Sequence, residues 1–455
     1  MKKASKIITG FNKGEYKALI KDLYIEDARL TKQKNRYVAA LKKFIELYGD
    51  EEVEIYSAPG RSEICGMHTD HQHGKMLACA VNRDIIAVVT PTDDNVVRLV
   101  SEGFPDIRPI TISKTGLRLA FDEQGTTESL IKGIVSQFQK LGYEVGGFKA
   151  YITSEVPLYS GMSSSAAIEV LLATILNGLY NSGSINSLII AQIAQYAENI
   201  YFGKPCGLMD QAACAIGGLI KIDFKDPRKP LIKKQMIKFE QFNHSLCIVD
   251  TKDVPANLTK EYRAIIEEMR SVAKYFGKEF LREVDENEFY DHIIPMRKVC
   301  SDRAILRAMH FSSEEKRVNK ELKALRDGNF NEFKIQVKRS GNSSFEYLQN
   351  VYSSKDPSHQ NISLAICMSE KILKDKGVVR VHGPGFEGTI QVFVENDYAR
   401  KYGILKEKDK NLEGNDVREG LTTILSVSIP EEILQFEGQT KGKLGTPQAK
   451  PAVES

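Results

Sequence analysis

The sequence predicts an α+β protein built from two domains. Three observations support this class. The length of 455 residues exceeds what a single hydrophobic core usually serves. Strand-like alternation and helical periodicity follow one another in two successive blocks. Between the blocks, residues 226–235 are polar and contain proline, which is typical of a domain boundary.

These patterns divide the chain into four parts. Helical spacing begins before the first strand pattern, and apolar residues become scarce from Gly438 onward. We therefore expect a helical extension over residues 1–35, a first domain over 36–225, a second domain over 226–435 and a disordered tail over 436–455.

The first domain is expected to combine several strands with two helices. The spacing of apolar residues predicts a helical start within residues 1–50. Val53 and Ile55 then predict a strand that enters a tight turn at Ala58-Pro59-Gly60. The remaining strands are expected near 85–89, 96–100, 110–112 and 148–152, and the helices over 163–181 and 187–201.

Farther along, strands return before a long helical stretch. Alternating apolar residues predict strands at 219–224 and 245–249, and helical periodicity then extends from about 257 to 374. Two further strands, 378–381 and 390–394, flank a glycine-rich turn. This order makes the second domain helix-rich.

Composition limits the classes of partner. Hydrophobic residues make up 42% of the chain, enough for a sizeable core, and the net charge of +3 is too small to indicate nucleic acid as the main partner. No apolar run reaches the roughly 18–20 residues that cross a bilayer, and no signal-peptide pattern follows Met1. The seven cysteines form no CxxC pair. We therefore expect free thiols and a cytoplasmic location, with no membrane partner.

The most informative segment lies between a strand and a helix. Residues 156–167 read VPLYSGMSSSAA, a loop of small residues that opens a helix. Unpaired N–H groups at such a helix start bind phosphate, and serines add hydroxyl donors. A plain helix cap with spare serines is the alternative. The chain has no GxxxxGK[ST] loop. The expected phosphate-binding residues are Ser160, Gly161, Met162, Ser163, Ser164 and Ser165.

A second segment concentrates charged and polar side chains in a loop after a strand. Residues 58–74 contain Arg61, which can neutralise phosphoryl charge, and His68 and Asp70, which can bind sugar hydroxyls. A solvated polar loop without function is one alternative. The other is a metal site, for which the possible ligands would be His68, Asp70, His71 and His73.

A third segment places one acidic residue among apolar residues and glycines. Residues 203–211 read GKPCGLMDQ, and Asp210 is a candidate base or charge partner for a reacting hydroxyl. The alternative is that Asp210 caps the helix that follows.

In this order the segments resemble the GHMP kinase superfamily, and within it the galactokinase family. The resemblance covers roughly residues 40–430. Five stretches match the patterns APGRVNLIGEHTDYNGG, PxGxGLSSSAA, AE, PCGIMDQ and GxGFGG. They are Ala58 to Gly74, Pro157 to Ala167, Ala197-Glu198, Pro205 to Gln211 and Gly383 to Gly388.

The resemblance implies a fold, an activity and roles for single residues. The fold would be the two-domain GHMP kinase fold, with mixed sheets packed with helices and the active site in the interdomain cleft. The activity would be transfer of a phosphoryl group from ATP, with Mg²⁺, to the C1 hydroxyl of galactose or a close relative. The implied residues are Arg61 and Asp210 as catalytic, Met67, His68, Asp70, Gly207 and Tyr262 for the sugar, and Ser164 with Glu198 for the metal.

Four positions depart from the family pattern and leave alternatives open. Met67 and Glu63 stand where galactokinases have Glu and Asn, and Tyr159-Ser160 and Glu387 alter the two glycine-rich turns. Loss of a carboxylate at Met67 would favour a sugar altered at C6, so a galacturonate 1-kinase is one alternative. A catalytically weak sensor of sugar and ATP is another, and a kinase of a non-sugar alcohol is a third. A monomer and a dimer both fit the sequence.

Overall fold

The computed structural model describes most of the chain up to residue 402. The described ranges are 1–24, 27–105, 107–113, 115–119, 121–157, 160–237, 239–251, 259–386, 388–402, 422–424, 436–437 and 443–444. Tyr159, Glu387 and most of the expected tail lie outside the described residues.

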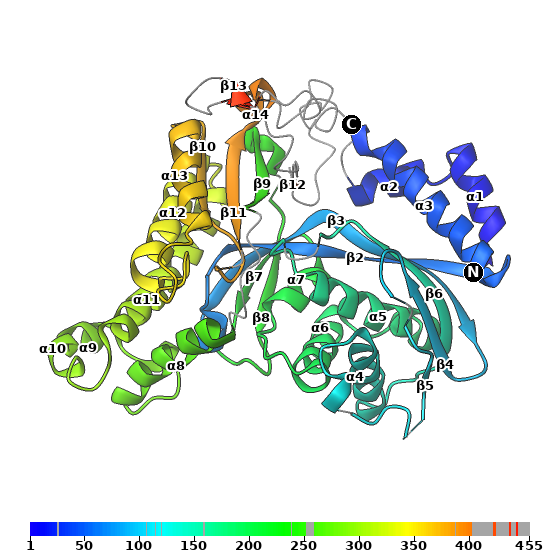
Figure 1. The fold of residues 1–455 in the computed structure, drawn as a ribbon, viewed down its shortest axis with the longest axis horizontal. Helices are drawn as coiled ribbons and strands as arrows, with labels where there is room; N and C mark the ends of the chain where they lie inside the picture. Colours follow the sequence, from blue (N-terminus) through cyan, green and yellow to red (C-terminus); the bar gives the residue numbers. More distant parts are fainter. Residues whose placement is uncertain are drawn as a thin grey trace.

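Eight strands of the described chain form one mixed sheet (Figure 1). The order is β1-β2-β3-β6-β4-β5, with β7 pairing the far part of β3 and β8 pairing β7. All expected strands of this region are present. Their bounds are β1 (Lys2–Lys3), β2 (Glu52–Cys65), β3 (Lys75–Thr92), β4 (Val96–Ser101), β5 (Ile110–Thr111), β6 (Gly147–Ser154), β7 (Leu219–Asp223) and β8 (Leu231–Gln235).

The expected turn at Ala58-Pro59-Gly60 is wrong. Strand β2 continues through it, and its pairing with β3 shifts register between Pro59 and Arg61 and again between Glu63 and Cys65. An irregularity of this kind accommodates a proline and a glycine inside a paired strand. As a result Arg61 projects from a strand and not from a loop.

The two faces of this sheet carry different helices. Ile85, Ala87 and Val89 of β3 belong to a core with α4 to α6, whereas Ile86 and Val88 belong to a core with the N-terminal helices. This split follows from the alternation of side chains along a strand. On the first face lie α4 (Thr127–Lys140), α5 (Ser164–Asn181), α6 (Ser187–Tyr196) with its π-helical continuation η3 (Ala197–Phe202), and α7 (Met209–Ile216).

The opposite face is covered by an N-terminal helical unit, shown in blue in Figure 1. It consists of α1 (Ala4–Lys13), α2 (Lys17–Tyr24) and α3 (Asp27–Tyr48). These helices confirm the helical start expected within residues 1–50. Helix α3 is continuous across residue 35, so the helical unit ends at Tyr48 and not at the boundary expected for the extension.

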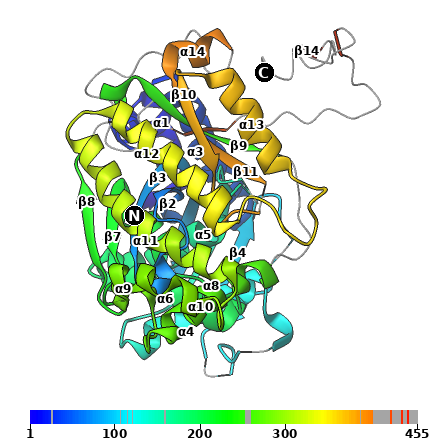
Figure 2. The ribbon, with the colours of Figure 1, turned by 90° about the vertical axis from the view of Figure 1, so that its left-hand side faces the viewer.

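The second half contains a smaller sheet with the order β10-β11-β9-β12. Figure 2 shows α11, α12 and α13 in front of this sheet. Its strands are β9 (His244–Asp250), β10 (Gly377–Val381), β11 (Thr389–Glu395) and β12 (Thr422–Ile424), and β13 (Phe436–Glu437) pairs with β14 (Lys443–Leu444). The helices are α8 (Thr259–Tyr275), α9 (Glu286–Asp291), α10 (Ile293–Met296), α11 (Asp302–Arg326), α12 (Phe330–Ser343), α13 (Asn361–Leu373) and α14 (Asn396–Lys401).

The segment expected to separate the domains lies inside a hairpin. Strands β7 and β8 pair on either side of residues 226–230, so the larger sheet extends beyond residue 226. Polar and proline residues mark tight turns as readily as domain linkers. Within the described residues, no helix combines the length and the apolar composition needed to cross a membrane.

Candidate active site

Arg61 and Asp210 are joined by two hydrogen bonds. Arg61 Nε lies 2.7 Å from Asp210 Oδ1, and Arg61 Nη2 lies 2.7 Å from Asp210 Oδ2. The Arg61 side chain is 5% exposed and the Asp210 side chain 30% exposed. Strand β2 supplies the arginine, and the first turn of α7 supplies the aspartate. A fork-to-carboxylate pair of this kind is strong and directional.

The charge state of Asp210 follows from this pair. Burial would raise the pKa of Asp210, but the Arg61 charge and the hydrogen bonds from Arg61 and Ser163 outweigh it, so the pKa lies below its usual value. Asp210 is therefore ionised at neutral pH. A carboxylate with a lowered pKa is a weak base, so this group is better suited to accepting a hydrogen bond from a hydroxyl than to removing its proton.

The small-residue loop meets this pair directly. Ser163 has a left-handed φ of 54°, precedes the first residue of α5, and donates its hydroxyl to Asp210 Oδ2. Arg61 Nη1 donates to the carbonyl of Gly161, and the Arg61 backbone N–H donates to the carbonyl of Met162 at 3.1 Å. The structure thus brings the expected phosphate loop, Arg61 and Asp210 together at one helix N-terminus, where an anion is favoured.

The serines of the loop have different partners. Ser160 donates to the carbonyl of Pro157 at 2.7 Å and so closes its own turn. Ser165 donates to Glu198 Oε1 at 3.1 Å. Ser164 is the first residue of α5, and within the described residues no hydrogen bond joins it to Glu198. The serine that bonds to Glu198 is therefore Ser165, and a shared metal site of Ser164 and Glu198 stays a prediction.

Glu198 lies in a buried acidic site. It is 2% exposed and accepts hydrogen bonds from Gln211 Nε2 at 2.7 Å and Lys204 Nζ at 3.3 Å. Gln211 Nε2 also donates to Glu169, whose second carboxylate oxygen is buried and has no hydrogen-bond partner among the residues that the structure describes. Burial and the Glu198 charge raise the pKa of Glu169 well above its usual value. The sequence motifs indicate no role for Glu169, Lys204 or Gln211.

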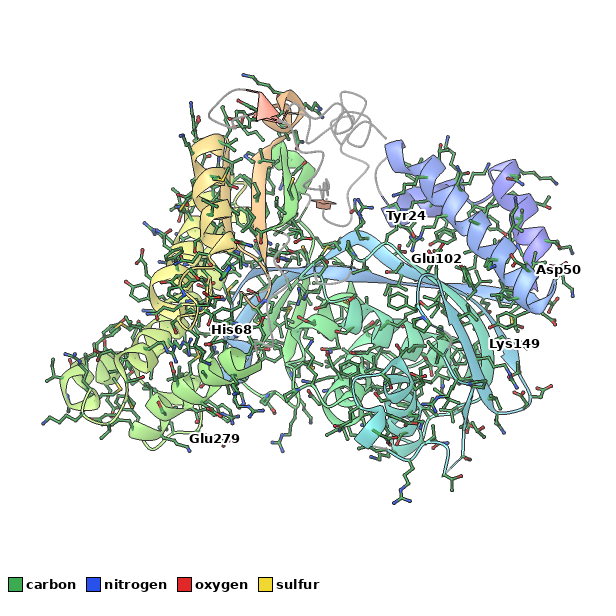
Figure 3. All side chains as sticks on the ribbon, in the orientation of Figure 1. Tyr24, Asp50, His68, Glu102, Lys149 and Glu279 are labelled. Atoms are coloured by element: carbon green, nitrogen blue, oxygen red, sulfur yellow. The ribbon has the colours of Figure 1, made fainter. Side chains whose placement is uncertain are left out.

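The residues expected to bind the sugar come from both halves of the chain. His68 Nε2 lies 2.7 Å from the carbonyl of Pro384, and the Tyr262 hydroxyl donates to the carbonyl of Gly385 at 2.9 Å. The two rings are stacked with centroids 6.4 Å apart. Figure 3 places His68 near the helices of the second half. The glycine-rich turn after β10 therefore holds the sugar-side residues in position.

Asp70 and Gly207 are also brought together. A Cβ atom built on Gly207 would lie 1.8 Å from Asp70 Oδ2. Burial, with a further contribution from the Asp210 charge, raises the pKa of Asp70 to about 6. The two carboxylates therefore have different proton affinities, since only Asp210 is paired with Arg61.

Met67 and Glu63, which depart from the family pattern, have partners within the protein. Met67 is fully buried, and its sulfur accepts hydrogen bonds from Asn350 Nδ2 at 2.9 Å and Ser344 Oγ at 3.3 Å. Glu63 is 4% exposed and lies 3.5 Å from the guanidinium of Arg380. Burial raises the pKa of Glu63 to about 7. A contact of Met67 with substrate stays a prediction, and the Glu63 carboxylate faces Arg380 in a buried network.

The alternative of a histidine metal site has no geometric support. Within the part of the chain that the structure describes, no three His, Cys, Asp or Glu side chains are grouped to hold a metal ion. His73 instead stacks on Phe280 with ring centroids 3.6 Å apart. His68 and His71 remain near each other, with ring centroids 5.8 Å apart, but two rings alone do not make such a group.

Comparison with known proteins agrees with this geometry. The family model described as GHMP kinases N terminal domain matches residues 129–218, and the galactokinase galactose-binding signature matches residues 42–91. Galactokinase of Lacticaseibacillus casei is 30% identical over 76% of this chain and 87% of its own length. Galactokinase of Streptomyces coelicolor is 30% identical over 63% of this chain and 73% of its own.

The chain belongs to the galactokinase family. The expected resemblance is thereby confirmed, and the chain is an ATP-using sugar kinase of the galactokinase type. The family model described as DNA gyrase B also matches residues 381–455. Within that range the structure describes helix α14 and strand β11, which is an inner strand of the second sheet.

Solved structures confirm the fold of this galactokinase-family chain. Lactococcus lactis galactokinase, solved in complex with galactose, superposes with a TM-score of 0.69 at 24% identity, over 80% of this chain and 91% of that one. Methanococcus jannaschii mevalonate kinase gives a TM-score of 0.54 at 16% identity, over 77% and 93%. The expected α+β GHMP kinase fold is therefore correct.

Proposed function

We propose that this enzyme phosphorylates the C1 hydroxyl of galactose or a close relative, with Asp210 orienting the hydroxyl and Arg61 stabilising the transferring phosphoryl group. The observation that carries the proposal is the meeting of Arg61, Asp210 and Ser163 at the N-terminus of α5. Phosphoryl transfer depends on positioning and charge neutralisation more than on covalent help, and these groups supply both.

Asp210 has room for the attacking hydroxyl. Its oxygens already accept hydrogen bonds from Arg61 and Ser163, but a carboxylate has about four acceptor sites and this side chain is 30% exposed. A sugar hydroxyl that donates to Asp210 is held beside the Arg61 guanidinium. The positive charge then faces the position in which negative charge develops during transfer.

The residues around Glu198 fit a magnesium ion. Mg²⁺ prefers carboxylate and hydroxyl oxygens, and Glu198 of η3 offers them together with Ser164 and Ser165 at the start of α5. The unpartnered buried oxygen of Glu169 adds acceptor capacity nearby. When bound, Mg²⁺ would neutralise charge on the ATP phosphates. Lys204 already supplies a positive charge to Glu198.

On the sugar side, His68, Asp70, Gly207 and Tyr262 remain the proposed contacts. The galacturonate alternative depended on Met67, which is bonded to Asn350 and Ser344 and gives it no support. The sensor alternative is disfavoured because the Arg61–Asp210 pair is intact. We also propose a cytoplasmic location, since all seven cysteines are free thiols.

An assay of ADP release tests the proposal. Galactose, galacturonate, glucose, arabinose, N-acetylgalactosamine and mevalonate would each be supplied with ATP and Mg²⁺, and the product would be located by phosphorus NMR. We expect turnover with galactose or a close relative and a phosphate on C1. Turnover of mevalonate alone, or a phosphate on another carbon, would overturn the assignment.

A further inference from the structure

The N-terminal helical unit is attached to the sheet by charged groups as well as by apolar packing. Glu155, just beyond the end of β6, lies 2.8 Å from Lys32 Nζ and accepts a hydrogen bond from Gln33 Nε2 at 2.7 Å. Arg36 and Arg83 approach the same carboxylate at 3.9 and 3.6 Å. Burial would raise the pKa of Glu155, but the bonds from Lys32 and Gln33 and the Arg36 charge lower it to about 2.

A second attachment point lies beside the first. Asp84 of β3 accepts hydrogen bonds at 2.6 Å from Tyr24 of α2, from Arg36 of α3 and from Ser57 of β2. The carbonyl of Asp84 also accepts the Glu155 backbone N–H at 2.9 Å. The two carboxylates thus form one polar cluster that joins α2 and α3 to β2, β3 and β6.

This cluster borders the two segments that carry the catalytic groups. Across the sheet Asp84 pairs with Pro59, which directly precedes Gly60 and Arg61. After Glu155 the chain reaches Val156, whose side chain would lie 3.2 Å from a Cβ on Gly60, and Pro157, whose carbonyl accepts the Ser160 hydroxyl. Both Arg61 and the phosphate loop therefore begin next to the polar cluster.

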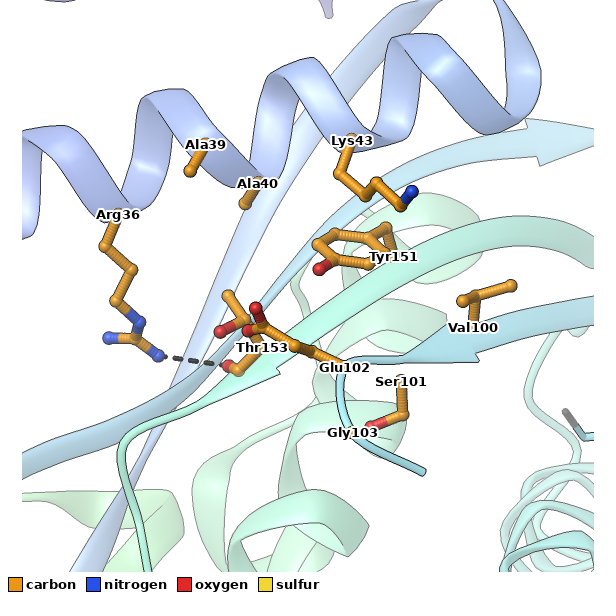
Figure 4. Close-up of a pocket in the computed structure, with 10 residues that line it drawn as sticks. All are labelled: Arg36, Ala39, Ala40, Lys43, Val100, Ser101, Glu102, Gly103, Tyr151 and Thr153. Carbon is orange, nitrogen blue, oxygen red and sulfur yellow. Dashed lines mark hydrogen bonds between the residues drawn. The ribbon is translucent and has the colours of Figure 1, made fainter. Parts of the chain in front are cut away.

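A pocket opens along part of the contact between α3 and the sheet. A pocket of about 620 Å³ separates Ala39, Ala40 and Lys43 from strands β4 and β6 (Figure 4). At one end of this pocket Arg36 donates to the carbonyl of Thr153 at 3.0 Å. Apolar side chains of α3 pack on the sheet elsewhere, so the polar cluster and this apolar core together fix the distance between α3 and the end of β6.

We propose that Glu155 is a positioning residue through which the N-terminal helical unit holds the phosphate loop and Arg61 in place for ATP. The proposal rests on the function proposed above, since it assigns the loop to the ATP phosphates. Through this clamp a unit on one face of the sheet controls nucleotide affinity on the other.

The test compares Glu155→Gln with the wild-type enzyme. The substitution keeps the shape and a hydrogen-bond acceptor but removes the charge that holds Lys32 and Arg36. We expect the Kd for a non-hydrolysable ATP analogue with Mg²⁺ and the KM for ATP to rise about tenfold, within the range for changes in a connecting network. The KM for galactose should stay within about twofold, and Glu155→Asp should restore most of the ATP affinity.

A matched control separates positioning from stability. Asp50 accepts hydrogen bonds from Ser5 N at 2.9 Å and Ser5 Oγ at 2.7 Å at the far end of the same helical unit. Asp50→Asn should lower thermal stability without changing ATP affinity. If Glu155→Gln does not fold, Lys32→Gln removes one partner of Glu155 at a side chain that is 62% exposed.

Hydrogen exchange gives a readout that does not depend on turnover. Backbone amides of residues 160–165 should exchange faster in Glu155→Gln than in the wild type or in Asp50→Asn. Unchanged exchange and unchanged ATP affinity in Glu155→Gln would overturn the proposal. A wild-type enzyme that bound no nucleotide would instead overturn the proposed function, and faster exchange would then still support the clamp.

Discussion

The carboxylate of Asp70 lies against the backbone of Gly207, so closely that a Cβ atom at residue 207 would approach Asp70 Oδ2 to 1.8 Å. The Asp70 side chain, in the segment after β2, therefore contacts the backbone of the segment before α7 directly. Since both residues are proposed sugar contacts, this closeness fixes where the sugar-side carboxylate points.

Gly207→Ala should impair sugar binding selectively. The added methyl group must displace Asp70, which can move because only its side chain obstructs the Cβ. We expect the KM for galactose to rise about tenfold, the scale of one lost hydrogen bond to a charged group, with the KM for ATP nearly unchanged. Steady-state kinetics with each substrate varied in turn measures both. An equal rise in the two KM values would contradict this role.

The pH dependence of sugar binding should report Asp70. Its pKa of about 6 lies above the usual value, so the group is protonated below pH 6 and ionised above it. An ionised carboxylate is the better acceptor for sugar hydroxyls, so the KM for galactose should fall as the pH rises through about 6. Asp70→Asn should remove this dependence. A wild-type KM for galactose that stays constant from pH 5 to 7 would exclude this role of Asp70.

Asp210→Asn should reduce kcat strongly. The amide keeps the shape of the side chain but removes the negative charge of the group that accepts hydrogen bonds from Arg61 and Ser163. We expect kcat to fall by about 10²-fold or more. Because both residues act as a pair, Arg61→Ala combined with Asp210→Asn should be little worse than either single variant. Single-turnover measurements with labelled ATP isolate the transfer step. Additive losses would indicate that the two residues act separately.

Glu321→Gln should stabilise the protein at alkaline pH. Glu321 is fully buried, and burial raises its pKa to about 8. The unfolded chain loses this proton near pH 4.5 and the folded chain near pH 8, so stability falls as the pH rises between them.

The gain from Glu321→Gln should therefore be small at pH 5 and largest at pH 8 to 9. We expect an increase in Tm of roughly 2–4 °C at pH 8. Differential scanning calorimetry at the two pH values measures it. Glu267→Gln, at an exposed residue of α8, is a suitable control. A gain that is equal at both pH values would argue against the titration of Glu321.

The sequence was sufficient to predict the central pair of the site. Arg61 and Asp210 lie 149 positions apart, and only the three motifs indicated that they would meet. The strands and the two helices around the phosphate loop also follow from local patterns, since each has a clear period and a clear end. Ser182 and Gly203, for example, end α5 and η3 with left-handed backbones.

Partners that depend on tertiary structure were not predictable. Nothing near Glu63 in the sequence indicates its neighbour Arg380, 317 positions away, and nothing near Met67 indicates Asn350. The polar segment 226–230 is compatible with a linker and with a hairpin turn, and only the pairing of β7 with β8 distinguishes them. Local composition describes an environment, whereas these contacts depend on how distant elements pack.

The π-helical turn η3 bears on how the site tolerates changes in chain length. A π turn contains one residue more than the α-helical turn that it replaces, and such turns often mark functional sites. Deleting one residue within Ala197–Phe202 would let the helix return to the regular form, and the chain beyond it would keep its direction because the π turn had accommodated the extra residue. The fold could absorb that shortening, but the acidic residue beside Ser165 could not keep its direction.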